Sequence, residues 1–353
     1  MVKRTREVHR NLKRIKVEVE NETQLSKNYD GQIPIEIKNE KNIQIDIKEE
    51  LKNNTLTGQT VYGDLDKPER KLAPNIFKNA KQTTEGPANW TRIYNEVVKM
   101  RSKITTPVDT QGCERMPNSI SPGIQKRDPK RFRFQLLISL MLSSQTKDEI
   151  NFAAMMKLES FFKNFGGLCI EGILATSEKQ IDDLICQVGF HNRKAGYIKR
   201  TCEILMETHE GDVPKTIEEI TSLPGIGPKM GYLLLQNAWN LTLGIGVDVH
   251  LHRLAQAWGW VRKSNNPETT RADLESWLPR EYWADINPLM VGFGQVVCVP
   301  RASNCDVCYL SHGLCKSRNR KLRLPLTEER IVKLNKQRGD LSALIADAAN
   351  KDW

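Results

Sequence analysis

Long apolar runs are what this sequence lacks most clearly. No window approaches the roughly 18 consecutive apolar residues that a membrane-spanning helix needs, and no charged start leads into an apolar core and a small-residue cleavage site. The sequence therefore predicts a soluble, intracellular protein with no membrane partner. Because disulfides are unfavourable in that setting, the eight cysteines are expected to be buried apolar residues or metal ligands.

An excess of acidic residues is also missing. Lys and Arg number 53 against 43 Asp and Glu, which gives a formal net charge of +10. A positive balance favours a polyanionic partner such as nucleic acid over an acidic small molecule. Charge alone does not distinguish nucleic acid from an anionic membrane surface.

The first 87 residues contain too little apolar bulk to build a core. Their richness in Lys, Glu, Asn, Gln and Thr predicts a disordered, basic arm, although the alternating runs IPIEIK and IQIDIK leave an edge strand or hairpin open. The basic clusters VKRTR and NLKRIK fit a nuclear localisation signal or a phosphate-binding arm, and an Arg-rich start also fits a mitochondrial transit peptide. The expected location is the nucleus, with the mitochondrion as a further address.

The arm also repeats the tetrapeptide Ile-Lys-x-Glu three times, at Lys16, Lys38 and Lys48. This repeat resembles the acceptor site for attachment of a small ubiquitin-like modifier. Chance repetition is the alternative in a segment so rich in Ile, Lys and Glu.

From about residue 88 no strand-turn-strand pattern occurs, and the apolar residues recur with helical periodicity. The stretch RFRFQLLISLMLSS is apolar on nearly every side, which predicts a buried helix. Thr146, Ser177 and Thr216 are each followed three residues later by Glu or Gln, which predicts capping boxes at three helix starts, and Gly211 is typical of a helix end. The expected fold class is all-α, as a packed bundle of short helices rather than a coiled coil.

Two glycines stand in LPGIGPK, between a helix that runs into Leu223 and one that begins at Pro228. Pro228 suits the first helical position because its missing N–H would be unpaired there anyway. Gly225 and Gly227 allow a tight turn whose exposed N–H groups can bind a phosphate, as in a helix-hairpin-helix. An ordinary tight turn between two helices is the alternative.

Lys229 lies in the first turn of that second helix, where the positive end of the helix dipole disfavours a cation. A free amine is favoured there, and it can attack a carbon and form a Schiff base. A phosphate contact is the alternative role. Asp248 in GVDVH is the predicted N-cap of another helix. An amine and a carboxylate together suit expulsion of a base from deoxyribose, because the carboxylate stabilises the cationic sugar that the amine captures.

Four cysteines fall within 18 residues, spaced C-x6-C-x2-C-x6-C. They are Cys298, Cys305, Cys308 and Cys315. Clustered thiolates indicate a metal site and suit either zinc or an iron–sulfur cluster. Zinc sites usually combine two C-x2-C pairs, whereas this loop has one, which favours the cluster. The scattered cysteines are expected to be structural: Cys113, Cys169, Cys186 and Cys202.

Together, LPGIGPK, GVDVH and the four-cysteine loop resemble the endonuclease III family of DNA glycosylases, within the helix-hairpin-helix superfamily, over roughly residues 90–318. The resemblance implies two lobes, one a six-helix barrel and one that holds an iron–sulfur cluster, with DNA across the cleft between them. The predicted parts are an arm (1–87), the barrel lobe (126–242) with its helix-hairpin-helix (about 217–239), the cluster lobe (88–125 plus 243–318) and a C-terminal extension (319–353) without an assigned function.

The resemblance also implies roles for single residues. Lys229 and Asp248 match the family's catalytic lysine and aspartate, and the four clustered cysteines match the ligands of a [4Fe-4S] cluster. Gln145 would fill the gap left by a flipped nucleotide, and Phe190 would wedge into the duplex, with core packing as its alternative role. The predicted DNA-binding residues are Gln145, Phe190, His191, Gly225, Gly227 and His250.

The chain departs from the family pattern at two points. The last gap between cysteines is one residue longer, and Val249 stands where a threonine usually follows the aspartate. The implied function is a monomeric, bifunctional DNA N-glycosylase and apurinic/apyrimidinic lyase that removes oxidised pyrimidines from double-stranded DNA in base excision repair. The alternatives are a monofunctional adenine glycosylase, against which Lys229 argues, an 8-oxoguanine glycosylase, which would lack the cysteines, and a noncatalytic DNA-binding protein with a metal cluster.

Overall fold

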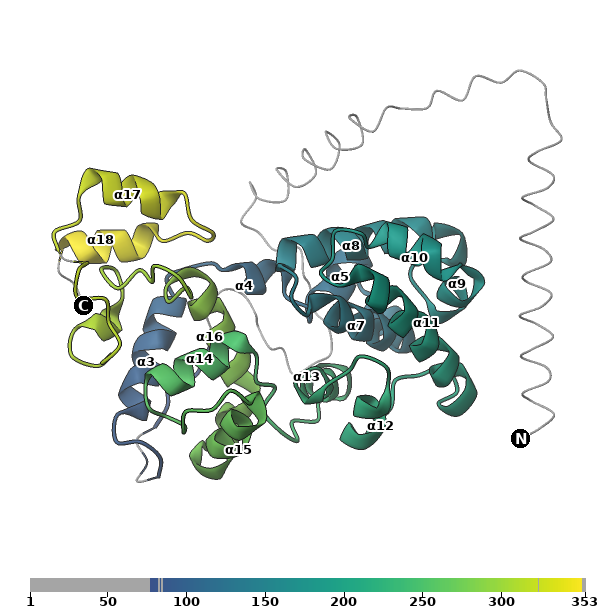
Figure 1. Ribbon diagram of the computed structural model, residues 1–353, viewed down its shortest axis with the longest axis horizontal. Helices are drawn as coiled ribbons and strands as arrows, with labels where there is room; N and C mark the ends of the chain where they lie inside the picture. Colours follow the sequence, from purple (N-terminus) through teal and green to yellow (C-terminus); the bar gives the residue numbers. More distant parts are fainter. Residues whose placement is uncertain (1–76, 82, 84, 323, 351–353) are drawn as a thin grey trace, which may run out of the picture. The chain divides into compact units, whose positions relative to one another are not determined.

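The computed structural model describes residues 77–350 except 82, 84 and 323. Every regular element in this part of the chain is a helix (Figure 1), which confirms the all-α prediction. No helix within these residues is long and apolar enough to cross a membrane. Most of the predicted arm, with Lys16, Lys38, Lys48 and the basic clusters, lies outside the described residues.

One hydrophobic cluster, which we call the middle core, is built from a continuous stretch between Met116 and Leu235. At its centre lies α7, whose residues 136–142 are all buried, as the all-round apolar pattern predicts. The helices of this stretch are α5 (Met116–Ile120), α6 (Ile124–Arg127), α7 (Pro129–Ser143), α8 (Asp148–Phe161), η1 (Lys163–Phe165), α9 (Ile170–Ala175), α10 (Glu178–Leu184), α11 (His191–Thr208), α12 (Ile217–Ser222) and α13 (Pro228–Trp239).

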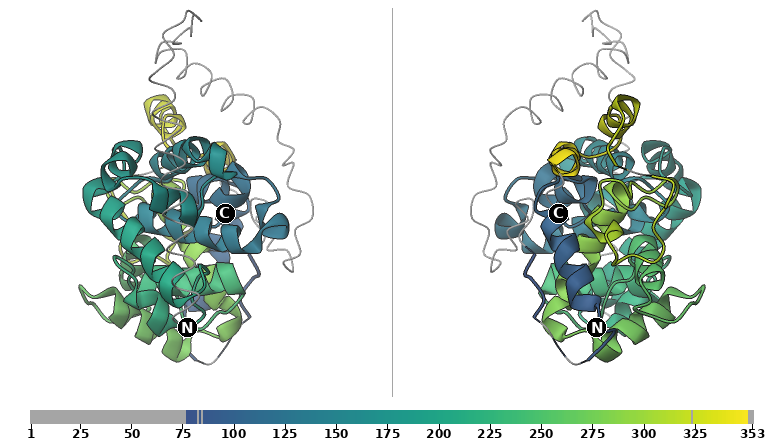
Figure 2. Two further views of the ribbon diagram at one scale, coloured as in Figure 1. Left: turned by 90° about the vertical axis from the view of Figure 1, so that its right-hand side faces the viewer. Right: turned by 90° about the vertical axis from the view of Figure 1, so that its left-hand side faces the viewer.

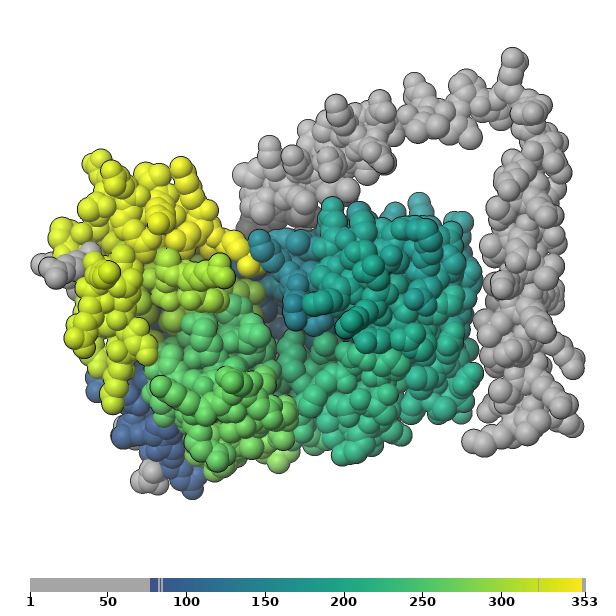
Figure 3. All heavy atoms as spheres, viewed as in Figure 1, coloured from purple at the N-terminus to yellow at the C-terminus, as the bar shows by residue number. Residues whose placement is uncertain are grey.

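A second cluster, the composite core, joins three separate segments, 77–104, 245–310 and 334–348. In Figure 3 its blue and green-to-yellow segments share one mass, and the teal middle core forms the other. Its helices, together with α4 and η2 beside them, are α3 (Trp90–Arg101), α4 (Pro107–Gln111), α14 (Val249–Ala257), α15 (Pro267–Trp277), η2 (Arg280–Tyr282), α16 (Trp283–Val296), η3 (Tyr309–Ser311), α17 (Glu328–Asn335) and α18 (Ser342–Asn350).

Three predicted boundaries differ from those of the cores. Met116 and Ile124 are buried in the middle core, although 88–125 is predicted as part of the cluster lobe. Phe77 and Ala80 are buried in the composite core, so the folded part begins before residue 88. At the other end, the tail forms two short helices, α17 and α18, drawn in yellow in Figures 1 and 2. Leu334 and Leu344 from these helices are fully buried in the composite core. The tail, which the sequence shows only as weakly helical, is therefore part of the folded unit.

Helix starts follow the predicted caps with one exception. The Ser177 and Thr216 hydroxyls accept N–H bonds from the first turns of α10 and α12, as predicted. The cap predicted at Thr146 is wrong, because α8 begins at Asp148 and the Thr146 hydroxyl makes no bond to that helix. It accepts instead from the backbone N–H of Gly189 at 3.1 Å, a partner distant in the sequence.

Candidate active site

The two glycines of the predicted hairpin lie between α12 and α13 and have different constraints. Gly225 has a φ of +76°, and a Cβ there would lie 2.4 Å from Cδ2 of Tyr197, so only glycine fits. At Gly227, by contrast, a Cβ would meet no atom of the described residues within 4 Å. The left-handed backbone and the contact with the Tyr197 ring thus require glycine at 225, while Gly227 faces open space that a partner can approach.

Lys229 is the second residue of α13, directly after Pro228 at the first helical position, as predicted. Its carbonyl oxygen lies 3.1 Å from the position that a Cβ on Gly246 would take. The loop at Gly246 is held in place by Asn287, whose amide Nδ2 donates to the Gly246 carbonyl at 2.6 Å. The start of α13 therefore lies against the loop that leads, two residues later, to Asp248.

Asp248 caps α14, which confirms the predicted N-cap. Its Oδ1 accepts from the backbone N–H of Leu251 at 2.8 Å. The residue is half-buried, as is Lys229. Next to it, Val249 is 74% exposed, so the side chain that replaces the family's usual threonine points into solvent. The carboxylate is anchored by its cap bond and remains partly accessible.

A second carboxylate near Lys229 was not found by sequence reasoning. Asp148, the first residue of α8, accepts from Nε2 of Gln295 at 2.7 Å, and Oε1 of Gln295 accepts from the Val108 N–H at 3.1 Å. Burial raises the pKa of Asp148, while its nearness to Lys229 opposes that rise. The Cys113 thiol also lies within electrostatic range of Lys229. An acidic residue in a first turn suggests only a favourable helix dipole, so the sequence carried no signal for this contact.

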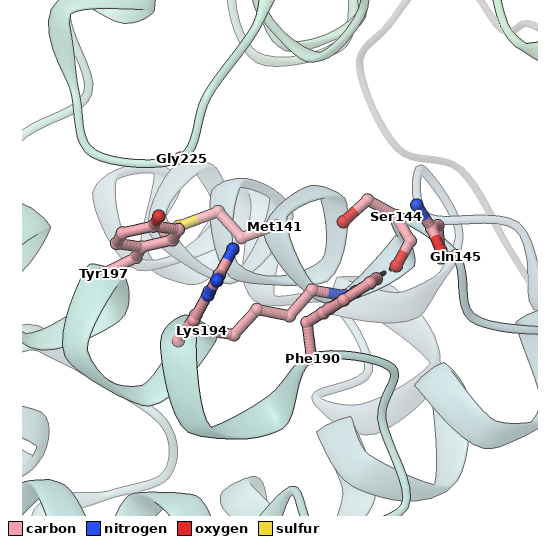
Figure 4. Close-up of a pocket in the computed structure, with 8 residues that line it drawn as sticks. Met141, Ser144, Gln145, Phe190, Lys194, Tyr197 and Gly225 are labelled. Carbon is pink, nitrogen blue, oxygen red and sulfur yellow. Dashed lines mark hydrogen bonds between the residues drawn. The ribbon is translucent and has the colours of Figure 1, made fainter.

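Gln145 and Phe190 stand close together at one pocket of the middle core (Figure 4). Both have positive φ, 52° and 59°, and both are exposed. Phe190 is 55% exposed, which is incompatible with the alternative of core packing. The pocket has a volume of about 270 Å³. It is lined by Met141, Ser144, Gln145, Phe190, Arg193, Lys194, Tyr197 and Gly225.

Lys194 also lines this pocket, and it was not predicted as a site residue because lysines are rarely buried. Only 5% of the residue is exposed. Its Nζ donates to the carbonyl oxygens of Leu142 and Ser144, both at 2.7 Å, and Figure 4 shows it reaching toward Ser144. Burial lowers the pKa of Lys194 to about 8. This amine therefore ties α11 to the loop that carries Gln145.

The two histidines predicted to contact DNA do not line the pocket. The His191 ring pairs with Asp182 through Nδ1. The His250 ring packs against Gly294 in α16, where an added Cβ would lie 2.6 Å from Nδ1. Burial lowers the pKa of His250, which favours the neutral ring. The structure thus gathers Gln145, Phe190 and Gly225 and leaves both histidines in other contacts.

The four clustered cysteines follow α16 and lie near one another. Burial raises the pKa of the Cys308 thiol well above its usual range, and the three other sulfurs contribute to the rise. Nη1 of Arg253 donates to Sγ of Cys298 at 3.5 Å, and the Asn319 N–H donates to Sγ of Cys305 at 3.4 Å. In the described part of the chain no three His, Cys, Asp or Glu side chains are already arranged as a metal site. The sulfur donor set, with N–H groups directed at two sulfurs, still fits a metal–thiolate group.

The scattered cysteines have varied environments. Cys202 is fully buried, and Sγ of Cys169 accepts the Gly172 N–H at the start of α9. Both fit the predicted structural role. Cys186 is exposed, so it contributes nothing to a core.

Comparison with known proteins identifies relatives of this chain. The family model described as "HhH-GPD superfamily base excision DNA repair protein" matches residues 138–280. The "Endonuclease III homolog" of Schizosaccharomyces pombe is 49% identical over 65% of this chain and 62% of its own length. The "Endonuclease III-like protein 1" of Mus musculus is 43% identical over 65% of this chain and 73% of its own.

Among solved structures, a trapped endonuclease III–DNA covalent intermediate matches with a TM-score of 0.48 and 24% identity, over 60% of this chain and 96% of that one. The chain spans less than two thirds of the length of the fission-yeast relative. It covers 73% of the mouse relative at 43% identity, well beyond what an isolated motif would give. By this similarity the chain belongs to the endonuclease III family of base excision DNA repair proteins.

Proposed function

We propose that this protein is a bifunctional DNA N-glycosylase and apurinic/apyrimidinic lyase that removes oxidised pyrimidines from double-stranded DNA. The observation that carries the proposal is the position of Lys229, at a helix start packed against the loop that leads to Asp248. A protein that only binds phosphates has no need of a carboxylate on the loop that packs against its lysine-bearing helix start. A glycosylase that forms a covalent intermediate needs both groups.

The chemistry assigns one task to each group. Asp248, held by its cap bond, stabilises positive charge on the deoxyribose as the bond from C1′ to the damaged base breaks. The amine of Lys229 bonds to C1′, the departing base takes up a proton, and opening of the sugar ring gives a Schiff base. Loss of a proton from C2′ then breaks the C3′–O bond by β-elimination and cuts the strand. Water finally hydrolyses the imine and frees Lys229.

DNA contacts are assigned to the exposed residues near the hairpin. Gly227 offers open backbone at the start of α13, where N–H groups can bind a phosphate. Phe190, exposed on its left-handed turn, would enter the stack, while Gln145 would fill the space left by the flipped nucleotide. His191 and His250 are weaker candidates, since the Asp182 pair and the packing on Gly294 already occupy their rings.

We also propose that the four-cysteine loop holds a [4Fe-4S] cluster, with Cys298, Cys305, Cys308 and Cys315 as its ligands. The cluster would supply a rigid link between four points of one loop. Arg253 and the Asn319 N–H would stabilise the negative charge of the bound sulfurs. The bond-breaking steps proposed above need only Lys229, Asp248 and water, so the cluster would have a structural role.

The remaining assignments rest on the sequence. We propose that the protein acts as a monomer in the nucleus, with the mitochondrion as a further location. Modifier attachment at Lys16, Lys38 and Lys48 remains a prediction from the repeated tetrapeptide.

Borohydride trapping tests the function directly. The full chain is mixed with a duplex that carries one thymine glycol, and borohydride reduces any imine to a stable adduct. The wild-type protein should form a covalent complex with DNA, and Lys229→Gln should form none. Lys263→Gln, which removes an equal charge at an exposed site away from the pair, is the matched control and should form the complex.

Two results would contradict the proposal. If the protein binds the duplex but the wild type yields no adduct, Lys229 is a phosphate contact and the protein is a noncatalytic binder or acts on another lesion without a lysine intermediate. If Lys229→Gln still yields the adduct, another amine is the nucleophile. Release of adenine from a mismatched duplex without an adduct would favour the adenine glycosylase alternative.

A further inference from the structure

The C-terminal tail, which carries no assigned role, is packed directly against the four-cysteine loop. Leu334, Leu341 and Leu344 of the tail are buried in the same hydrophobic cluster as Val307 and Leu310 of that loop. Apolar contact alone would fix the tail only loosely in direction, because hydrophobic burial is not directional. Polar anchors decide which part of the loop the tail holds.

The first anchor is Arg330 on α17. Its Nε donates to Oδ2 of Asp306 at 2.6 Å, and its Nη2 donates to Oδ1 of the same carboxylate at 2.9 Å. The Asp306 side chain is 1% exposed and the Arg330 side chain 16%, so the pair is largely removed from water. A bidentate pair of this kind fixes geometry as well as charge. Asp306 lies directly after Cys305 and two residues before Cys308.

The second anchor is a paired amide contact at Asn304, on the other side of Cys305. Asn304 is fully buried, and its Nδ2 donates to Oε1 of Gln337 at 2.6 Å. Nε2 of Gln337 donates back to Oδ1 of Asn304 at 3.2 Å. Arg330 also reaches this amide oxygen at 2.9 Å. The tail therefore forms hydrogen bonds with both sequence neighbours of Cys305, Asn304 and Asp306.

A third anchor follows Cys308. The Tyr309 hydroxyl donates to Asp347 on α18, and Nζ of Lys103 pairs with the same carboxylate at 2.7 Å. Between the second and third anchors, Gly339 runs so close to Val296 that a Cβ would lie 2.7 Å from Cγ2. The tail thus contacts the chain on both sides of the C-x2-C pair and closes tightly over the end of α16.

We propose that residues 327–348 form a clasp that holds the four-cysteine loop in place and so limits how fast the loop releases its iron–sulfur cluster. This inference rests on the proposed function for the identity of the cluster. The anchors themselves are contacts of the protein. Without them, Asn304 and Asp306 would be free to turn toward water, and Cys305 would move with them.

The test compares single variants of the full-length protein that carries its cluster. Arg330→Gln removes the bidentate pair. Lys333→Gln removes an equal charge from the exposed side of the same helix and is the matched control. Decay of the cluster's visible absorbance in excess chelator, and hydrogen exchange of residues 299–314, are measured for each. Arg330→Gln should lose absorbance about tenfold faster, as expected when a group that orients a metal ligand is removed, and its loop should exchange faster.

Because Arg330→Gln leaves the buried Asp306 without its partner, a general loss of stability must be separated from opening of the clasp. The double variant Arg330→Met with Asp306→Leu removes both charges, so neither is left buried without its partner. Faster cluster loss in both variants, with hydrogen exchange in α7 unchanged, supports the clasp. Absorbance loss at the wild-type rate in both variants overturns it.

The design also separates this inference from the proposed function. Iron and sulfide are assayed in the wild-type protein first. If neither is present, the cluster and the retention role of the clasp are both refuted, while borohydride trapping still tests Lys229. If the cluster is present and only the clasp variants behave as wild type, the clasp alone is refuted.

Discussion

The middle core and the composite core are built in opposite ways. The middle core is folded from one continuous stretch of the chain, within which helices far apart in the sequence, such as α7 and α13, also pack together. The composite core collects three distant segments, and aromatic rings join them: the Trp90 ring lies 5.4 Å from that of Trp277 and 5.9 Å from that of Tyr282. The middle core can therefore be assigned to one run of the sequence, whereas the composite core is recognised only from contacts between distant segments.

The largest expected effect comes from Arg101, which joins α3 to Asp109 in α4 and, across the fold, to Leu289 in α16. Arg101 is fully buried in α3, forms a bidentate pair with Asp109, and donates to the Leu289 carbonyl at 3.3 Å. Arg101→Leu would leave a buried carboxylate unpaired, and we expect a loss of about 3–5 kcal/mol in the free energy of unfolding. Denaturant titration followed by tryptophan fluorescence measures it.

The matched control is Arg92→Leu, on the exposed side of the same helix, which should change stability by less than about 0.5 kcal/mol. Hydrogen exchange adds a regional readout. If Arg101→Leu speeds exchange in α3 and α16 but not in α7, the two cores open separately. Equal acceleration in α7 would show that they unfold as one cooperative unit.

The second test is at the point where the cores meet, the contact between the start of α13 and the loop before Asp248. Asp248→Asn should keep the cap, since asparagine caps helices as well as aspartate does. It removes the negative charge, and we expect single-turnover base excision to slow by at least about 100-fold. Asp248→Ala should in addition lose about 1 kcal/mol of stability. If Asp248→Asn excises the base at the wild-type rate, Asp248 acts only as a helix cap.

Sequence reasoning succeeded where a residue acts on its chain neighbours. Ser177, Thr216 and Asp248 are caps as predicted, because a cap bond spans only three residues. The cap predicted at Thr146 was wrong because its hydroxyl accepts a hydrogen bond from the N–H of Gly189, which is distant in the sequence. No periodicity or cap signal records a partner that arrives from a distant segment.

The same limit explains the missed site residues. Lys194 and Asp148 look like ordinary surface charges in the sequence, yet both are drawn inward by partners on other elements. The packing of the C-terminal tail was missed for a related reason. Its few leucines make a weak amphipathic pattern alone, and only the composite core shows what they cover.

The third prediction breaks a long-range contact inside the middle core. Lys194→Met keeps the apolar stem but leaves the Leu142 and Ser144 carbonyls without this donor. We expect a loss of about 2 kcal/mol in unfolding free energy and weaker binding to lesion DNA, because the Gln145 loop loses its anchor. Lys157→Met, exposed on α8, is the control and should behave as wild type. If Lys194→Met has the stability and DNA affinity of the wild type, Lys194 does not anchor the loop that carries Gln145.

The stability cost of burying Lys194 should also depend on pH. The pKa of Lys194 is about 8 in the folded protein, below its ordinary value of 10.5, so above about pH 8 the unfolded chain binds the proton more readily. The contribution of Lys194 to stability should therefore rise with pH in this window. The stability difference between the wild type and Lys194→Met should grow from about pH 7 to about pH 9.5. A constant difference would mean that the amine keeps its proton in the fold.

The smallest predicted effect separates packing from partner contact within a single turn. Gly225→Ala forces an alanine into a left-handed conformation against the Tyr197 ring, and we expect a loss of about 1–2 kcal/mol in unfolding free energy. Gly227→Ala has ordinary backbone angles and open space around its Cβ, so stability should stay within about 0.5 kcal/mol of wild type. Because that space is where a phosphate would approach, Gly227→Ala should nevertheless weaken DNA binding, measured by titration at fixed salt. Full DNA affinity in Gly227→Ala would mean that the hairpin is an ordinary turn between two helices, held by the middle core alone.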